Sequence, residues 1–158
     1  MCSRLRGVLL RLSDTELLVL PHLPDMDISE GFQIEEPDVF VPWSASESEL
    51  SDLLGSHLRH VTDGYYTLSC RSLSGMAHEL GFHFKPRRNG KLNELEFFRR
   101  SYADQASSYE QFQRHFEQAF GSPDRTEAGT EGFASHEWRC PGSVIRHYVF
   151  DRFGPEEH

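Results

Sequence analysis

Lysine and arginine are missing from residues 13–58, a stretch of 46 residues that carries eleven carboxylates. The other 112 residues hold all sixteen basic side chains and fourteen acidic ones, so they are nearly balanced. The formal net charge of −9 therefore comes from this one stretch. The negative field of such a stretch attracts basic surfaces and repels nucleic acid. We expect a basic protein partner and no nucleic-acid partner.

Long hydrophobic runs are also missing, and cysteine is scarce. No segment approaches the roughly 20 apolar residues that span a bilayer, and Arg11 ends the short apolar run near the start. We therefore expect no membrane segment and no secretory signal. The three cysteines, Cys2, Cys70 and Cys140, are odd in number and form no CxxC motif. This pattern predicts reduced, mostly buried thiols in a cytoplasmic protein.

Motifs for catalysis are weak, and no cofactor is indicated. The segment from His78 to His83 is similar to a zinc-protease helix, but its second histidine comes five positions after the first instead of four. A better candidate is the group of His136, Glu137 and His147, which a final hairpin could bring together near Asp151. It leaves a small metal-dependent or acid–base enzyme as an alternative function.

The length favours one domain, residues 1–158, with an acidic N-terminal part (1–60) and an aromatic-rich part (61–158). Sixteen of the nineteen aromatic residues lie in the second part. We therefore expect that part to supply most of the core.

The acidic part has few regular patterns. Ser13 and Glu16 have the spacing of a capping box, which favours a strand followed by a short helix, although a hairpin over the same residues is the alternative. Residues 21–43 hold four prolines and six carboxylates and are predicted to be extended and loop-rich. Ser44 and Glu47 form a second capping box, which predicts a helix over about 47–59.

The strongest local prediction is a hairpin in the middle of the chain. After a turn at residues 62–64 and a strand over 65–72, residues 78–86 alternate, with Leu80, Phe82 and Phe84 on one face. Asn89-Gly90 is typical of a type I′ turn, and residues 92–99 are predicted to return as the partner strand.

The last third of the sequence predicts a helix and a second hairpin. Ser107 and Glu110 form a third capping box, and large apolar residues then recur at helical spacing up to Gly121. The predicted helix is 108–120, and strands are expected over 135–140 and 144–153. Together these elements predict an α+β fold, an antiparallel sheet of hairpins covered on one face by helices. We expect Phe112, Phe116 and Phe120 to pack against one sheet made of all these strands.

The acidic stretch is the candidate partner-binding site. Prolines hold several of its carboxylates on an extended segment, with large rings among them that could anchor a partner. The predicted interface residues are Asp25, Asp27, Glu30, Phe32, Glu35, Glu36, Asp38, Phe40, Trp43, Glu47 and Glu49. The alternatives are that the carboxylates form only a solvated surface, or that a basic cluster makes the contact instead; that cluster comprises Lys85, Arg87, Arg88 and Lys91.

One resemblance joins these features. The helix of residues 109–120 ends in Phe-Gly-Ser-Pro, strands bearing Trp138 and His147-Tyr148-Val149 follow, and the acidic region has no basic residue. In this the chain resembles the immunity proteins that bacteria pair with polymorphic or interbacterial toxins. The resemblance implies a non-enzymatic, cytoplasmic inhibitor that occludes the active site of a basic toxin enzyme such as a nuclease or deaminase. It assigns no individual residue, and an accessory adaptor domain is a further alternative.

Overall fold

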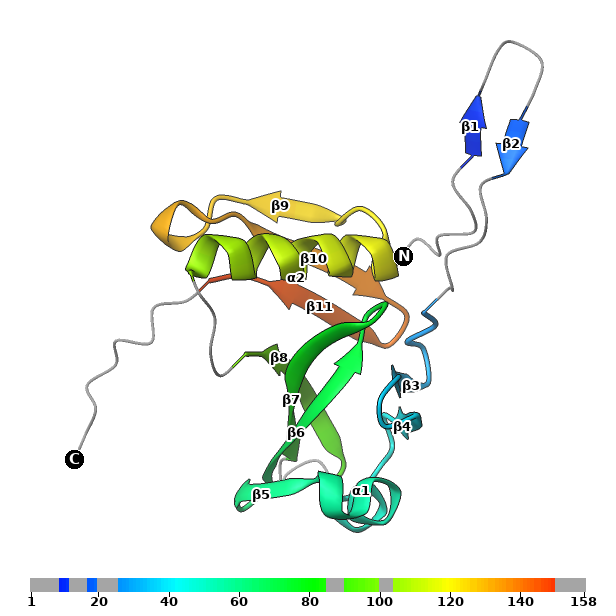
Figure 1. Cartoon of the computed structure of the whole chain (residues 1–158), viewed down its shortest axis with the longest axis vertical. Helices are drawn as coiled ribbons and strands as arrows, with labels where there is room; N and C mark the ends of the chain where they lie inside the picture. Colours follow the sequence, from blue (N-terminus) through cyan, green and yellow to red (C-terminus); the bar gives the residue numbers. More distant parts are fainter. Residues whose placement is uncertain (1–8, 12–16, 20–25, 85–89, 100–103, 150–158) are drawn as a thin grey trace. The chain divides into compact units, whose positions relative to one another are not determined.

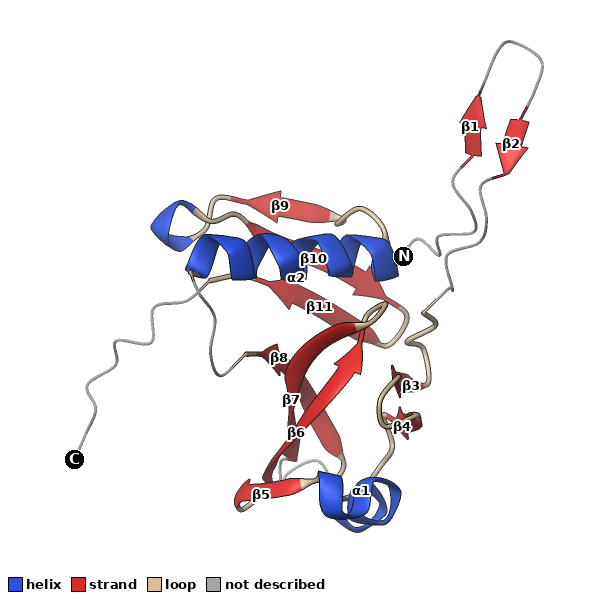
Figure 2. Ribbon diagram, in the orientation of Figure 1, coloured by secondary structure: helices blue, strands red, loops and turns tan. Residues whose placement is uncertain are grey.

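The computed structural model describes residues 9–11, 17–19, 26–84, 90–99 and 104–149. Its elements divide into two compact units. One comprises residues 26–105, and the other contains strands β1 and β2 together with the described residues from 106 onward. Antiparallel sheets and helices build both described parts, so the predicted α+β class is confirmed (Figures 1 and 2). The expectation of a single domain stays a prediction.

The unit of residues 26–105 is built on a four-stranded antiparallel sheet in the order β5-β6-β7-β8. Its strands are β5 (Arg59–Thr62), β6 (Tyr65–Ser72), β7 (Met76–Phe84) and β8 (Leu92–Phe98). The predicted turn at residues 62–64 and the strand over 65–72 are both confirmed. Strand β7 has the predicted alternation, because Leu80, Phe82 and Phe84 are all buried.

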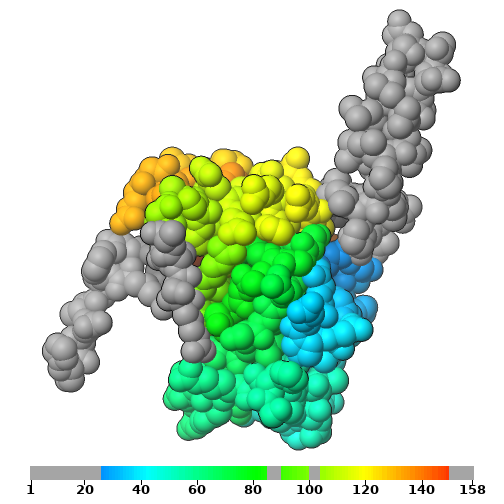
Figure 3. All heavy atoms as spheres, in the orientation of Figure 1, coloured from blue at the N-terminus to red at the C-terminus, as the bar shows by residue number. Residues whose placement is uncertain are grey.

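A second hairpin packs against this sheet. Strands β3 (Gly31–Ile34) and β4 (Val39–Pro42) pair in antiparallel register. The segment over 21–43 was predicted to be extended and loop-rich; its described part is extended, but it contains this strand pair, which was not predicted. The buried face of the hairpin carries Phe32, Ile34 and Val41, and the ring of Phe32 meets that of Phe97 edge-on at 5.3 Å. Figure 3 shows the hairpin in blue against the green strands. Its core contacts come from distant residues, which is why local patterns missed it.

Helix α1 (Glu47–Leu54) follows β4 and buries Leu50 and Leu54. Its capping box is formed by Ser46 and Glu49, so the predicted box is wrong by two residues. The helix is also shorter than predicted. It passes into a 3₁₀ turn, η1 (Gly55–His57), and the chain then enters β5. Gly55, with a positive φ of 52°, is the C-cap that ends α1.

In the other unit, helix α2 (Gln105–Phe120) lies across a three-stranded sheet in the order β11-β10-β9 (Figure 2). The strands are β9 (Arg125–Glu127), β10 (Ser135–Cys140) and β11 (Ser143–His147). Phe112, Phe116 and Phe120 are buried, and Phe116 contacts Trp138 with ring centroids 5.9 Å apart. The Trp138 indole N–H donates to the carbonyl of Gly121 at 2.8 Å, which ties the end of α2 to β10.

Several predictions for this unit need correction. The strands expected to form one sheet lie in two separate sheets, and the aromatic face of α2 packs on the three-stranded one. The helix begins at Gln105, so Ser107 lies inside it and is no N-cap. Strand β9 was not predicted, because its three residues are all exposed and carry no apolar pattern. The turn at Pro141-Gly142 is confirmed, with a φ of 77° at Gly142.

Near the N-terminus, β1 (Leu9–Arg11) pairs with β2 (Leu17–Val19) in antiparallel register. The favoured strand-then-helix prediction is therefore wrong, and the hairpin alternative is correct. Two short apolar runs on either side of the four polar residues 13–16 satisfy either pattern locally. Backbone pairing between the runs decides for the hairpin.

Two further predictions are settled only in part. Of the predicted Asn89-Gly90 turn only Gly90, with a φ of 68°, is described; Asn89 and the basic residues 85, 87 and 88 lie outside the described residues. Cys70 is a free, buried thiol as predicted. Cys140 is disulfide-bonded, which contradicts a reduced thiol there, and its partner lies outside the described residues. No helix of the described part is long and apolar enough to cross a membrane.

Candidate functional site

Asp25 lies outside the described residues. The other predicted interface residues lie within one unit, on the β3–β4 hairpin, on α1 and on the short segments just before β3 and α1. The hairpin is joined to α1 by residues 43–46, and α1 contacts β4. The structure divides these carboxylates into two kinds. Some are used to hold the fold, and others are exposed with few or weak partners.

Glu35 holds the fold. Its two carboxylate oxygens accept hydrogen bonds from the backbone N–H groups of Ser74 and Gly75, at 2.8 and 2.7 Å. These residues form the turn between β6 and β7, and Ser74 has a positive φ of 64°. Charge-assisted bonds to a strained turn stabilise it. Glu35 is therefore unsuited to a free contact with a partner.

The two glutamates of α1 also have local roles. The Ser46 backbone N–H donates to Glu49 at 2.7 Å, and this hydrogen bond lowers the pKa of Glu49. Glu47 accepts a hydrogen bond from the Tyr66 hydroxyl at 3.2 Å. Both carboxylates also sit in the first turn of the helix, where the macrodipole favours negative charge.

The remaining carboxylates are exposed and weakly bound. Asp27 accepts from the backbone N–H of Ser29, and Asp38 accepts from the side chain of Gln33. Glu36 lies 3.5 Å from the Arg71 guanidinium, an exposed pair that contributes little to stability. The acidic stretch thus receives a counterion from β6, which its own sequence lacks.

The three predicted aromatic anchors differ in how far they are exposed. Phe32 is 2% exposed and belongs to the core, so its assignment as an anchor is wrong. Trp43 is half-buried and donates its indole N–H to the carbonyl of Ile28 at 2.7 Å. Phe40 is 43% exposed and lies on the outer face of the hairpin, opposite Gln33 and two residues from Asp38. Exposed aromatic rings are enriched in protein interfaces, so Phe40 is the strongest of the three as an anchor.

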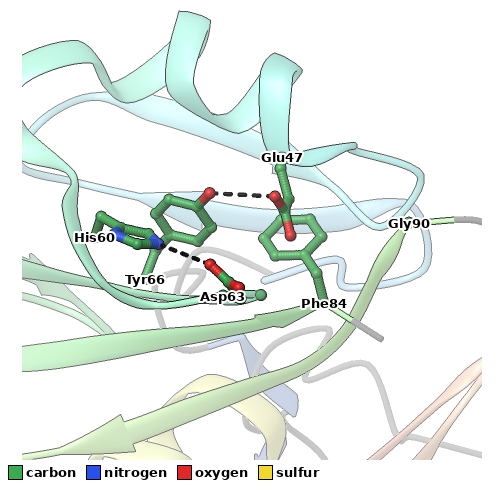
Figure 4. Close-up of a pocket in the computed structure, with 7 residues that line it drawn as sticks. Glu47, His60, Asp63, Tyr66, Phe84 and Gly90 are labelled. Carbon is green, nitrogen blue, oxygen red and sulfur yellow. Dashed lines mark hydrogen bonds and ion pairs between the residues drawn. The ribbon is translucent and has the colours of Figure 1, made fainter. Parts of the chain in front are cut away.

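Beside α1 the surface contains a hollow of about 390 Å³. Figure 4 shows Glu47, Tyr66 and Phe84 on one side, with His60 and Asp63 beside them. The Tyr66 ring meets that of Phe84 edge-on at 6.0 Å, and His60 lies 4.0 Å from Asp63. Of these residues only Glu47 was predicted. The others are spread over β5, β6, β7 and the turn between β5 and β6, so nothing in their spacing marked them.

The predicted His136 and His147 are cross-strand partners with ring centroids 6.4 Å apart. His147 stacks on Tyr109 at 4.5 Å, and one ring nitrogen lies 2.7 Å from the Gln113 side-chain oxygen. Burial, with the nearby His136, lowers the pKa of His147 to about 4. The imidazole is therefore neutral at pH 7.

The third member of that predicted group does not join it. Glu137 is bound by Arg139 and Arg146 at 2.8 and 3.0 Å, because neighbouring residues of a strand face opposite ways. Asp151 lies outside the described residues. Within the described ranges no three of His, Cys, Asp and Glu gather as metal ligands. The enzyme hypothesis stays a prediction.

A buried polar cluster in the four-stranded sheet was not predicted. His78 bonds to the Ser72 hydroxyl, lies 3.9 Å from the Cys70 sulfur and places its other nitrogen 3.0 Å from the Glu79 carbonyl. Burial lowers the pKa of His78 and raises that of Cys70 to about 12. All three side chains are buried, so the cluster serves the core of the sheet.

No protein-family model matches the chain, and no curated protein or solved structure matches it either.

Proposed function

We propose that the protein is a non-enzymatic inhibitor that binds a basic protein through the outer face of the β3–β4 hairpin. The observation that carries the proposal is the 43% exposure of Phe40 beside Asp38, on a hairpin that also exposes Glu30 and Glu36. The carboxylates would steer a basic partner to this face, and the ring would set the lifetime of the complex.

The function that fits this surface best is that of an immunity protein. The resemblance noted in the sequence implies a toxin enzyme as partner, and enzymes that act on nucleic acid have the basic clefts that an acidic surface can occlude. Within this proposal the inhibitor is cytoplasmic. The disulfide at Cys140 is the observation that weighs against a reducing compartment.

Charge reversal tests the proposal. The variant Glu30→Lys, Glu36→Lys and Asp38→Lys changes three exposed residues of the hairpin and spares Glu35, which holds the turn at Ser74. The partner to use is the basic toxin protein that the proposal requires, and the measurement is the rate of association. We expect the reversal to slow association by an order of magnitude or more at low salt and to leave the fold intact.

Salt provides a second readout. The Debye length falls from about 10 Å at 0.1 M to about 3 Å at 1 M ionic strength. Association of the unchanged protein should slow over this range, and association of the reversed variant should change little. The matched control is Arg87→Ala with Arg88→Ala, in the basic cluster. If that control abolishes binding and the reversal does not, the acidic-face proposal is wrong.

A further inference from the structure

The hollow beside α1 has the chemistry of a receptor for a cation. Its polar lining comprises the carboxylates of Glu47 and Asp63, the imidazole of His60 and the hydroxyl of Tyr66. No lysine or arginine is among its described lining residues. Aromatic rings complete it, since Tyr66 and Phe84 both line the hollow. Guanidinium ions bind to carboxylates through paired hydrogen bonds and to aromatic rings by stacking on the ring face. The hollow offers both kinds of group.

The geometry leaves acceptor capacity in the hollow. The Tyr66 hydroxyl donates to one oxygen of Glu47, at 3.2 Å, and thereby fixes the orientation of that carboxylate. The other oxygen, Oε1, lies 3.8 Å from where a Cβ on Gly64 would stand. A side chain at Gly64 would also meet the backbone oxygen of Phe84 at 2.6 Å, so glycine keeps this approach to Glu47 free.

The lining residues come from separate elements of the unit. Glu47 is the first residue of α1, Tyr66 lies in β6, and Phe84 ends β7, where its N–H donates to the Gly64 carbonyl at 2.8 Å. Asp63 and Gly64 form the turn between β5 and β6. The hydrogen bonds of Tyr66 to Glu47 and of Phe84 to Gly64 preorganise that part of the lining, which lowers the entropic cost of binding. The Asp63 side chain is fully exposed.

We propose that this hollow binds the guanidinium group of an arginine side chain of the basic partner. The inference rests on the proposed function for the identity of the partner. A planar guanidinium can pair with the free Glu47 oxygen and with Asp63, and it can stack on the Tyr66 ring.

The probe is N-acetyl-arginine N-methylamide, titrated into the uniformly labelled full chain and followed by backbone amide shifts. N-acetyl-citrulline N-methylamide is the matched ligand, because it keeps the shape and removes the charge. We expect saturable shifts at Gly64, Tyr66 and Gly90, with a dissociation constant on the order of millimolar. The citrulline compound should bind at least tenfold more weakly. Equal binding of the two compounds, or no saturable shift, would overturn the proposal.

Matched variants locate the site. The double variant Glu47→Gln with Asp63→Asn removes both charges at constant size. It should lower the affinity for the arginine probe at least tenfold. Glu94→Gln, an exposed carboxylate on β8 outside the hollow, should leave the affinity unchanged. Binding that appears only after Arg87→Ala with Arg88→Ala would overturn the proposal, because the chain's own arginines would then be the occupants. None of these results depends on the charge-reversal experiment, so each proposal can fail separately.

Discussion

The ring of Phe40 lies over Gly31 on the neighbouring strand, where a Cβ would stand 2.6 Å from the ring carbon Cζ. The same Cβ would come still closer to the backbone oxygen of Val41. An aromatic ring that covers a glycine of the paired strand protects the backbone there. One side of the Phe40 ring therefore packs on the hairpin, and the exposed part of the ring is open to a partner.

Replacing Gly31 with alanine should destabilise the hairpin. The new methyl group meets a backbone oxygen that cannot move away without breaking the strand pairing, so we expect a loss of about 1–3 kcal/mol in the free energy of unfolding. Urea unfolding measures it. Ser48→Ala, an exposed change on α1, is the control and should stay within about 0.5 kcal/mol. An alanine variant as stable as the original chain would contradict the close contact.

Truncating Phe116 to alanine should cost about 3–5 kcal/mol. The side chain is 3% exposed and lies between Phe112, Phe120, Trp138 and His147. The near-ultraviolet circular dichroism of Trp138 should weaken in the same variant. A loss below about 1 kcal/mol would show that this face of α2 is not packed on the three-stranded sheet.

The stability of the protein should fall as the pH is lowered from about 6.5 toward 4. The pKa of His147 is about 4 in the folded chain and 6.5 without burial, so the unfolded chain binds the proton more tightly. The stabilisation is complete above the unfolded pKa and is lost as the pH falls to the folded one. A difference of this size corresponds to roughly 3 kcal/mol.

His147→Phe tests that assignment, because it removes the titrating group and keeps a ring against Tyr109. We expect its unfolding free energy to depend less on pH between 4 and 6.5. A residual slope should remain, since burial also lowers the pKa values of His136 and His78. Ser48→Ala, the exposed control on α1, should leave the slope as it is. Identical slopes in the His147 variant and the original chain would refute the assignment.

The Cys70 thiol should react very slowly in the folded protein. Burial raises its pKa from 9.0 to about 12, which lowers the thiolate fraction at pH 8 about a thousandfold. Alkylation by iodoacetamide, followed by mass spectrometry of the Cys70 peptide, measures the rate with and without denaturant. Comparable rates in both conditions would mean that strands β6 and β7 open readily.

The elements with strong local periodicity could be predicted from the sequence. The strand alternation around Leu80 and the helical spacing of Phe112 and Phe116 are set by which face each element must bury. The charge of the acidic stretch is equally a property of the sequence. It determined that residues 13–58 themselves bring only negative formal charge to an interface, whatever the fold.

The tertiary structure decided what local patterns left open. Ser44 with Glu47 and Ser46 with Glu49 have the same spacing, and the second pair caps α1. There the Ala45 carbonyl accepts from the Leu92 N–H, so the chain just before the helix is held to the strand β8. The β3–β4 hairpin likewise depends on Phe97 and on the β6–β7 turn, which lie far along the chain.

The same division holds for the candidate site. The sequence identified a set of carboxylates and rings but could not separate Glu35 and Phe32, which hold the fold, from Phe40, which is exposed. It also could not bring Tyr66 and Asp63 together with Glu47, because the residues come from elements that meet only when the sheet and α1 pack. Charge and periodicity are properties of the sequence itself. Burial and the proximity of distant residues exist only in the folded protein, because long-range packing creates them.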